Sequence, residues 1–362
     1  MSRISRRKTV LFLSGPALGH VSRLSSIARR IRETSDARIH FVLPGVASHH
    51  DILQKSGFEF STVNIPKEAR DLPAVAFADG LETLFRDLSP DAIVHDMCPL
   101  RWLSVTRFPD CQRFHVTNFF LTRAHDAETS QKTWYDEIGG RVSEIRASRG
   151  LCPLKSVFDL YDADAVLLAD PPALCRRPDL LPSSYELCGP IFEQSEGDQP
   201  DALLNEENIL LLSMGSTGRD LPDNELISSL KEWSGSSASV YAGTEAEAAQ
   251  SKGLADHYHG WLPLKAILAK SRFCVTQGGA GSTYMALAAG VPVGVVPTDP
   301  NHRILGELIE QAGLGLCSVD NDTDDKIASA DYATLAENAR AFASEPTEGS
   351  RVIAQRISEM IQ

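Results

Sequence analysis

The sequence predicts two doubly wound α/β domains, one after the other, and three observations support this fold class. The chain has 362 residues, which is long for one hydrophobic core and comfortable for two domains of similar size. Short apolar runs bounded by turns alternate with segments of helical periodicity, as expected for buried parallel strands joined by helices. The succession of apolar strand, glycine-containing loop and helix occurs twice, starting near residues 10 and 209.

In the first half, apolar runs predict five strands. These are Val10–Ser14, Ile39–Leu43, Ala92–His95, Arg113–Thr117 and Ala165–Ala169. After the first run, apolar residues from Val21 to Ile31 recur at helical spacing, with arginines mostly on the other face. Gly15 and Pro16 interrupt the first run, so we interpret it as a core strand rather than a secretory signal. No stretch approaches the length that a membrane-spanning helix needs.

In the second half, the pattern restarts after an acidic stretch, Glu193–Pro200, that has no periodicity and is typical of a linker. The predicted strands are Ile209–Ser213, Ser239–Tyr241, Arg272–Thr276 and Val293–Val296, and the predicted helices are Leu264–Ala269, Ser282–Ala289 and Arg303–Ala312. Apolar residues from Val352 to Ile361 form one stripe of a final amphipathic helix. We expect domains at 1–190 and 206–345, a linker at 191–205, a cleft between the domains, and a helix at 346–362 that packs back across their junction.

Charge and cysteine usage narrow the function class. The net charge is −13, from 35 basic and 48 acidic residues, so the chain as a whole repels nucleic-acid phosphates and is not attracted to anionic lipid. We therefore expect no nucleic-acid partner, no integral membrane segment, and a small metabolite-like ligand. The seven cysteines are scattered and never form a C-x-x-C pair, which predicts reduced thiols in a cytoplasmic protein. A homodimer is left open.

A glycine-rich turn is the most informative motif. The predicted strand that ends at Thr276 runs into Gln277-Gly278-Gly279-Ala280-Gly281-Ser282 and then directly into a helix. Small residues let the backbone approach a ligand, and the free N–H groups at a helix start favour an anion such as phosphate. Close packing of a helix on a sheet also demands glycine, so the turn by itself leaves both interpretations open.

The segment from Trp261 to Gly315 resembles the donor-binding signature of the nucleotide-sugar-dependent GT-B glycosyltransferases. That signature reads approximately W-x-P-Q, then H-G-G-x-G-T-x-x-E-A-L-x-x-G-V-P, then P-x-x-x-D-Q. The matching residues are Trp261, Pro263, Gly278, Gly279, Gly281, Ala286, Leu287, Gly290, Val291 and Pro292. The resemblance implies the GT-B fold, two facing Rossmann-like domains, with Trp261 stacking on the nucleobase. It also implies that the turn from Gln277 to Ser282 holds the diphosphate.

A second loop of the same half, Ser213-Met214-Gly215-Ser216, resembles the S-x-G-S loop of this family. The resemblance implies that Gly215 and Ser216 approach the diphosphate from the opposite side. An ordinary turn at the end of a strand is the alternative. The predicted donor-binding residues are therefore Gly215, Ser216, Trp261, Gln277, Gly278, Gly279, Gly281, Ser282, Asp299, Asn301 and His302.

Three departures from the family pattern concern the donor. Gln277 replaces the usual histidine of the turn, and its amide can still donate to a phosphate oxygen. Met285 replaces the glutamate that holds the ribose hydroxyls, and it cannot accept their hydrogen bonds. Asn301-His302 stands where Asp-Gln usually holds the sugar, with Asp299 nearby as a substitute. The sequence thus predicts a UDP- or dTDP-sugar donor without fixing which.

His20 is the candidate catalytic base. Gly19-His20 follows the first strand and starts the first helix, as in family members whose histidine there takes the proton of the acceptor hydroxyl. Asp96 follows the strand Ala92–His95 at the same sheet edge and is the expected partner that orients the ring. The resemblance implies direct displacement with inversion, without a cofactor or metal, because helix dipoles and turn N–H groups would stabilise the leaving diphosphate.

The acceptor is not identified by the sequence. We expect N-terminal loops at Gly45–Ala78 and Phe119–Trp134 to build its pocket, in which Phe119, Phe120 and Trp134 would be either lining or ordinary core. Two alternatives to transfer remain. One is a catalytically impaired homologue that acts as an auxiliary partner of another transferase, and the other is an epimerase or hydrolase of a nucleotide sugar.

Overall fold

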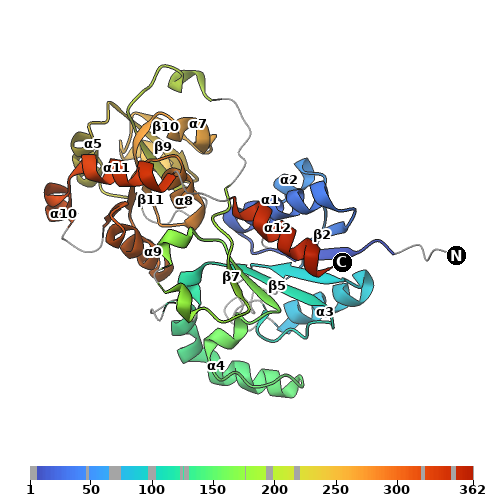
Figure 1. Ribbon diagram of the computed structural model, residues 1–362. Coiled ribbons are helices and arrows are strands. Elements are labelled where there is room, and N and C mark those ends of the chain that lie inside the picture. The colour runs from blue at the N-terminus through green and yellow to red at the C-terminus, as the bar shows by residue number, and fades with distance from the viewer. Residues whose placement is uncertain are drawn as a thin grey trace. The chain divides into compact units, whose positions relative to one another are not determined.

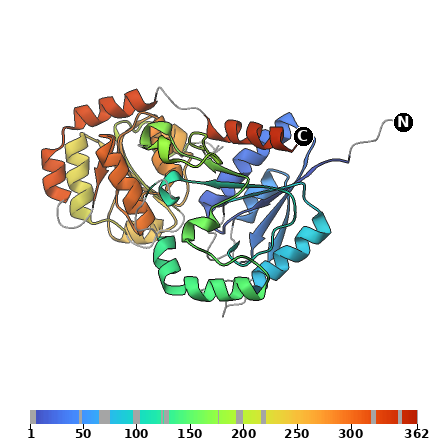
Figure 2. The same cartoon turned by 60° about the horizontal axis from the view of Figure 1, so that its bottom comes forward.

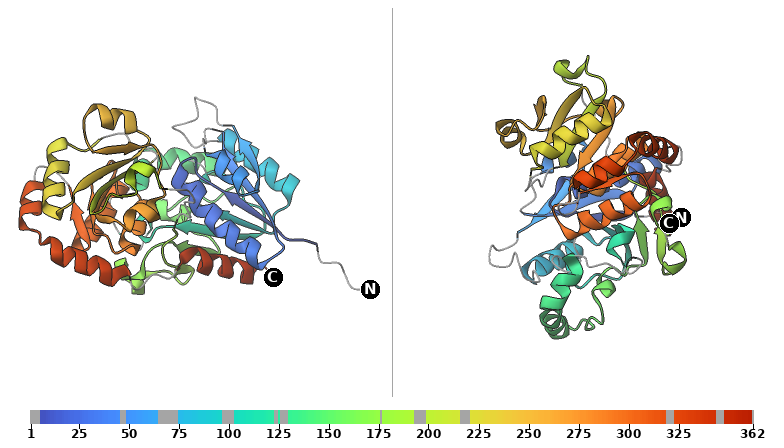
Figure 3. Two further views of the ribbon diagram at one scale, coloured as in Figure 1. Left: turned by 90° about the horizontal axis from the view of Figure 1, so that it is seen from above. Right: turned by 90° about the vertical axis from the view of Figure 1, so that its left-hand side faces the viewer.

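A computed structural model describes residues 6–45, 49–64, 75–96, 103–122, 125, 130–175, 177–192, 199–215, 221–318, 323–343 and 348–361. The chain forms two compact units. The N-terminal unit comprises Met1–Ile191 together with Glu348–Gln362, and the C-terminal unit comprises Phe192–Thr347. Each unit is a parallel sheet with helices on both faces (Figures 1 and 3).

The N-terminal sheet has seven parallel strands in the order β3-β2-β1-β4-β5-β6-β7. The strands are β1 (Thr9–Leu13), β2 (Arg38–Pro44), β3 (Glu59–Val63), β4 (Ala92–His95), β5 (Gln112–Thr117), β6 (Ala165–Leu168) and β7 (Tyr185–Leu187). The helices of this unit are α1 (Leu18–Thr34), α2 (His50–Lys55), α3 (Val75–Leu88), α4 (Ser130–Ser148) and α12 (Gly349–Met360). The five strands predicted from the sequence are present within one residue at either end.

One expectation for this unit is wrong. Residues 45–78 are not one long loop, because they include α2, the edge strand β3 and the start of α3. In the second expected loop, residues 119–121 form a short 3-10 helix in which Phe119 and Phe120 are buried, and α4 begins at Ser130. These two phenylalanines are therefore core residues. The side chain of Trp134 lies outside the described residues.

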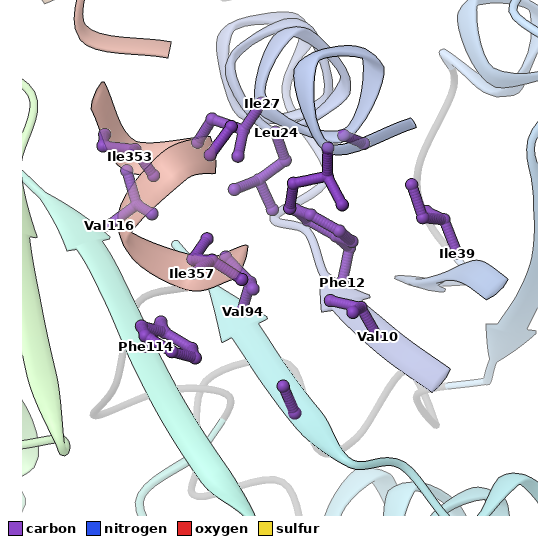
Figure 4. Packing of buried hydrophobic residues seen from close by; sticks show 14 of the residues in the cluster. Val10, Phe12, Leu24, Ile27, Ile39, Val94, Phe114, Val116, Ile353 and Ile357 are labelled. Atoms are coloured by element: carbon purple, nitrogen blue, oxygen red, sulfur yellow. The ribbon is translucent and has the colours of Figure 1, made fainter. Parts of the chain in front are cut away.

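The apolar runs are strands because both faces of the sheet are covered. Val10 and Phe12 of β1 belong to a cluster with α1 and α12, whereas Leu11 and Leu13 point to the other face and pack with α3. Figure 2 shows α1 and α12 over one face and α3 and α4 over the other. Figure 4 shows side chains of α1 and α12 gathered over strands β1, β4 and β5.

The final helix, α12, completes the core of the N-terminal unit. Ile353 and Ile357 are fully buried in the cluster with α1. Arg30 of α1 holds the Glu348 carboxylate with two hydrogen bonds of 2.7 and 3.0 Å at the start of α12. The Gly349 N–H donates to the Pro190 carbonyl at 2.9 Å. The start of α12 therefore contacts the backbone of the segment that follows β7.

The C-terminal sheet has six parallel strands in the order β10-β9-β8-β11-β12-β13. The strands are β8 (Ile209–Gly215), β9 (Ala238–Gly243), β10 (His257–His259), β11 (Ser271–Thr276), β12 (Val293–Val295) and β13 (Gly315–Cys317). The helices are α5 (Asn224–Ser234), α6 (Ala246–Ser251), α7 (Leu264–Leu268), α8 (Ala280–Ala288), α9 (Pro300–Gln311), α10 (Thr323–Ser329) and α11 (Tyr332–Ala343). Helix α8 begins two residues before the predicted Ser282.

Two further findings concern membranes and thiols. In the described part of the chain, none of the helices has the length and apolar character that crossing a membrane requires. The described cysteines, Cys111, Cys152, Cys175, Cys188, Cys274 and Cys317, are free thiols.

Gly349→Ala is expected to destabilise the fold by about 1–3 kcal/mol, the usual cost of overpacking a buried site. A Cβ atom at residue 349 would lie 2.0 Å from the Gly189 carbonyl oxygen, and backbone cannot yield as a flexible side chain does. The control is Gly140→Ala in α4, where an added Cβ meets nothing within 4 Å. Urea unfolding of both variants tests this prediction, and equal stability of the two would contradict it.

Candidate functional site

The candidate residues of the N-terminal unit lie where the strand order of its sheet reverses. The chain proceeds from β1 to β2 and β3 on one side and then crosses to β4 on the other. Leu13 of β1 pairs with His95 of β4, so the loop after β1 and Asp96 after β4 leave the sheet next to each other. Ligands of open α/β sheets characteristically bind at the carboxyl ends of the strands at such a switch point.

The structure brings His20 and Asp96 together there. His20 is the third residue of α1, and its Nδ1 atom lies 3.1 Å from Oδ2 of Asp96. The Asp96 side chain is fully buried, whereas the His20 side chain is 40% exposed. The two groups lie within ion-pair distance, but their geometry is not that of a hydrogen bond. The Oδ2 atom of Asp96 therefore has no hydrogen-bond donor among the described residues. A small rotation of the ring would align them, as often happens when a substrate binds.

Gly15 sets the position of the His20 ring. A Cβ atom at residue 15 would lie only 2.8 Å from Cγ of His20. The Gly15 N–H also points to the other carboxylate oxygen of Asp96, at 3.4 Å. The ring thus packs against bare backbone, and the same residue contacts both members of the pair. At the neighbouring Gly19 an added Cβ would meet nothing within 4 Å.

A second polar group lies along the same sheet edge and was not predicted. Arg23, one turn after His20 on α1, donates to the Asn118 side-chain oxygen at 2.9 Å. The Asn118 amide donates to the fully buried Asp170 carboxylate at 2.7 Å. Asn118 follows β5, and Asp170 lies just beyond β6. Their place after predicted strands is the signal that could have identified them.

The candidate residues of the C-terminal unit also lie at a switch point, between β8 and β11. Ser213 pairs with Thr276, which places Gly215 and Gln277 side by side at the strand ends. Gly215 adopts a left-handed backbone with φ +67°, and Ser216 lies outside the described residues. The Gln277 side chain is buried, and its Nε2 atom has no hydrogen-bond partner among the described residues. An amide N–H₂ group is therefore available to an acceptor at this edge.

The glycine turn presents backbone N–H groups. Gly278 has φ +91°, and its N–H donates to the Thr276 hydroxyl at 3.1 Å. Gly279 is the N-cap of α8, and it has no side chain that could accept hydrogen bonds from the first-turn amides. These amides and the helix dipole favour an anion. The predicted Gly281 and Ser282 belong to this first turn.

The start of α9 packs against this turn. Asp299 caps α9, because its Oδ1 atom accepts hydrogen bonds from the N–H groups of Asn301 and His302 at 2.8 and 3.1 Å. The His302 Nδ1 atom lies 3.0 Å from the Thr298 hydroxyl, and burial lowers the pKa of this histidine. These contacts give Asp299 and His302 structural roles, while donor contacts by Asp299, Asn301 and His302 stay predictions.

Trp261 follows β10, so it leaves the sheet at the same carboxyl edge. It is 50% exposed and is one of the large apolar side chains that the described surface leaves open. Met285 of α8 is buried. An exposed indole together with an N–H-rich turn is suited to a ligand that has an aromatic ring and a phosphate. Among the described residues, no three histidine, cysteine or acidic side chains gather as a metal site would require.

The chain has the GT-B fold, and its C-terminal part is similar in sequence to glycosyltransferases. Residues 247–355 match the family model described as the Erythromycin biosynthesis protein CIII-like, C-terminal domain. The fold is also that of CalG4, a calicheamicin glycosyltransferase. The two structures share a TM-score of 0.71 at 18% identity, covering 98% of each chain.

A second structure and a curated relative agree with this assignment. The spinosyn rhamnosyltransferase SpnG, complexed with thymidine diphosphate, gives a TM-score of 0.67 at 13% identity, covering 97% of this chain and 100% of its own. A PGL/p-HBAD biosynthesis rhamnosyltransferase of Mycobacterium bovis is 30% identical over 159 residues. That match covers 43% of this chain and 34% of the relative, so this chain spans about a third of the relative's length.

Gly278→Ala is expected to lower the free energy of unfolding by about 1–3 kcal/mol, because a non-glycine residue is strained at this positive φ. The added Cβ would also lie 2.7 Å from the His302 carbonyl oxygen and push α9 away from the turn. Gly281→Ala is the control, since its Cβ would meet nothing within 4 Å. Chemical unfolding that ranks Gly281→Ala below Gly278→Ala in stability would refute this account of the turn.

Proposed function

We propose that this protein transfers a sugar from a nucleotide sugar to a hydroxyl of a small-molecule acceptor. The reaction is a direct displacement with inversion at the anomeric carbon. One observation carries the proposal. A partly exposed His20 ring contacts a fully buried Asp96 carboxylate at the switch point of the N-terminal sheet, which is the arrangement that a general base requires.

The N-terminal unit binds the acceptor in this proposal. The acceptor hydroxyl oxygen forms a bond to the anomeric carbon while its proton passes to Nε2 of His20. Nδ1 faces Asp96, so the carboxylate holds the ring and stabilises the imidazolium that forms. Burial of Asp96 strengthens this attraction, because water does not screen the pair on the carboxylate side.

The C-terminal unit binds the donor. The bond from the anomeric carbon to the diphosphate breaks, and the leaving oxygen gains negative charge. We assign the hydrogen bonds to this oxygen to the amides of the α8 first turn and to Nε2 of Gln277, which has no partner among the described residues. The proposal therefore assigns the stabilisation of the leaving group to protein N–H groups rather than to a metal ion.

A thymidine nucleotide is the donor we favour over a uridine nucleotide. Met285 cannot accept hydrogen bonds from ribose hydroxyls, and a deoxyribose has one such hydroxyl fewer to leave unpaired. The thymidine diphosphate in the SpnG complex supports this choice. The exposed Trp261 would stack on the base.

His20→Ala is expected to reduce kcat for sugar transfer by about 10²–10⁴-fold, the usual contribution of a positioned base. Gly15→Ala should reduce kcat about 10²-fold, because displacement of the ring by its new Cβ misplaces the base. Gly19→Ala is the matched control and should retain activity. Kinetics with a screened acceptor measure all three, and full activity of His20→Ala would overturn the mechanism.

Calorimetry with UDP, dTDP, GDP and their sugar conjugates tests the donor site. One nucleotide, expected to be dTDP, should bind saturably, and Trp261→Ala should weaken binding by about 1–3 kcal/mol through lost stacking. Leu204→Ala is the control, because Leu204 is similarly exposed in the same unit. Failure of every nucleotide to bind would reject a functional donor site and favour the auxiliary-protein alternative. Sugar release without an acceptor would favour a hydrolase.

A further inference from the structure

A cavity of about 260 Å³ lies in the N-terminal unit, apart from the His20–Asp96 pair. It is on the sheet face that α3 and α4 cover (Figure 2). His95 of β4 and Thr106 are buried and form its inner part, whereas Arg146 and Asp159 are half-buried at its rim. His95 precedes Asp96, and successive residues along a strand point to opposite faces, so the cavity and the catalytic pair use different sides of β4.

The inner part of the cavity contains polar atoms without partners. Among the described residues, neither ring nitrogen of His95 nor the Thr106 hydroxyl has a hydrogen-bond partner. His95 is 2% exposed and Thr106 is 3% exposed. Buried polar groups are almost always hydrogen-bonded, and leaving one unpaired costs about 1–3 kcal/mol. Burial lowers the pKa of His95 well below its ordinary value, so the ring is neutral and offers one donor and one acceptor.

Two arginines add positive charge to the same cavity. The Arg113 guanidinium stacks on Phe108, 4.6 Å from the ring centre, and donates to the Asp162 carbonyl. Arg146 donates to the Ser104 carbonyl. These contacts use only part of the five N–H donors that each guanidinium has. Burial and the nearby charge of Arg146 lower the pKa of Arg113, so an anion between the two guanidinium groups would be favoured.

Nearby acidic groups limit the charge of such an anion. Asp159 lines the cavity, although its Oδ2 atom already accepts hydrogen bonds from the N–H groups of Lys155 and Ser156 at 2.7 and 3.0 Å. Asp162 and Asp164 lie near enough to Arg113 to oppose its loss of a proton. A monoanion therefore fits better than a dianion such as sulfate. The other described lining residues are Phe108 and three leucines, which suit an apolar body.

We propose that this cavity binds a small aromatic carboxylate. Its carboxylate group accepts hydrogen bonds from Arg113, Arg146, Thr106 and His95, and its ring packs against Phe108 and the leucines. The cavity volume of about 260 Å³ exceeds the ~150 Å³ of an engineered cavity that binds benzene, so a single ring with a carboxylate group fits. None of the described lining residues belongs to the predicted donor site or to the His20–Asp96 pair.

Isothermal titration calorimetry of the full chain tests this site with benzoate as the probe. Benzoate should bind saturably. Benzamide, which has the same shape without the charge, should bind at least about tenfold more weakly, because it lacks the charge-assisted hydrogen bonds. Sulfate, a dianion, should not compete. The proposal is wrong if benzoate shows no saturable binding, or if sulfate or benzamide binds as tightly.

Two matched variants locate the probe. Thr106→Val and Ser104→Ala each remove a buried hydroxyl that has no partner among the described residues, but only Thr106 is in the cavity lining. Neither change should lower the Tm of the free protein, and only Thr106→Val should weaken benzoate binding, by about tenfold for one hydrogen bond.

His95→Phe keeps the ring stacking while removing both unpaired nitrogens, so it should raise the Tm and abolish binding. Equal benzoate affinity in Thr106→Val and Ser104→Ala would overturn the assignment. None of these measurements depends on sugar transfer.

Discussion

The register of adjacent parallel strands at two switch points is the constraint on which both candidate sites depend. Pairing of Leu13 with His95 places the loop after β1 beside Asp96, and Gly15 can then contact both His20 and Asp96. Pairing of Ser213 with Thr276 does the same for Gly215 and Gln277. A shift of one residue in either pair would send the carboxylate or the amide to the opposite face of its sheet.

Burial explains which parts of the fold the sequence could predict. Central strands such as β1 and β8 are covered on both faces and read as unbroken apolar runs, so their positions follow from composition alone. The edge strand β3 has the sequence Glu-Phe-Ser-Thr-Val, of which only the valine is buried, and β10 is His-Tyr-His. Neither contains an apolar run. Pairing with one neighbour, rather than local sequence, makes these segments strands.

Which site residues could be predicted also depends on whether local sequence or the tertiary fold brings them together. His20 and Asp96 could be predicted as neighbours, because both follow strands that lie next to each other in a doubly wound sheet. The cavity beside His95 could not be predicted, because Thr106 and Arg146 reach it from segments far apart in the chain. The sequence also could not predict which glycines of the turn are required by close packing. The glycine-rich turn has three glycines, but an added Cβ would clash only at Gly278 and would meet open space at Gly279 and Gly281.

The two units differ in what a substitution would change under the proposed function. In the N-terminal unit the chemistry depends on one ring and one buried carboxylate, so it cannot survive loss of either side chain. In the C-terminal unit the diphosphate is assigned to amides of α8, which every residue except proline supplies. Departures such as Gln277 and Met285 leave those amides in place. Under the proposed function Gln277 still donates to the diphosphate, whereas Met285 favours a deoxyribose over a ribose, because it cannot accept a hydrogen bond from the additional hydroxyl.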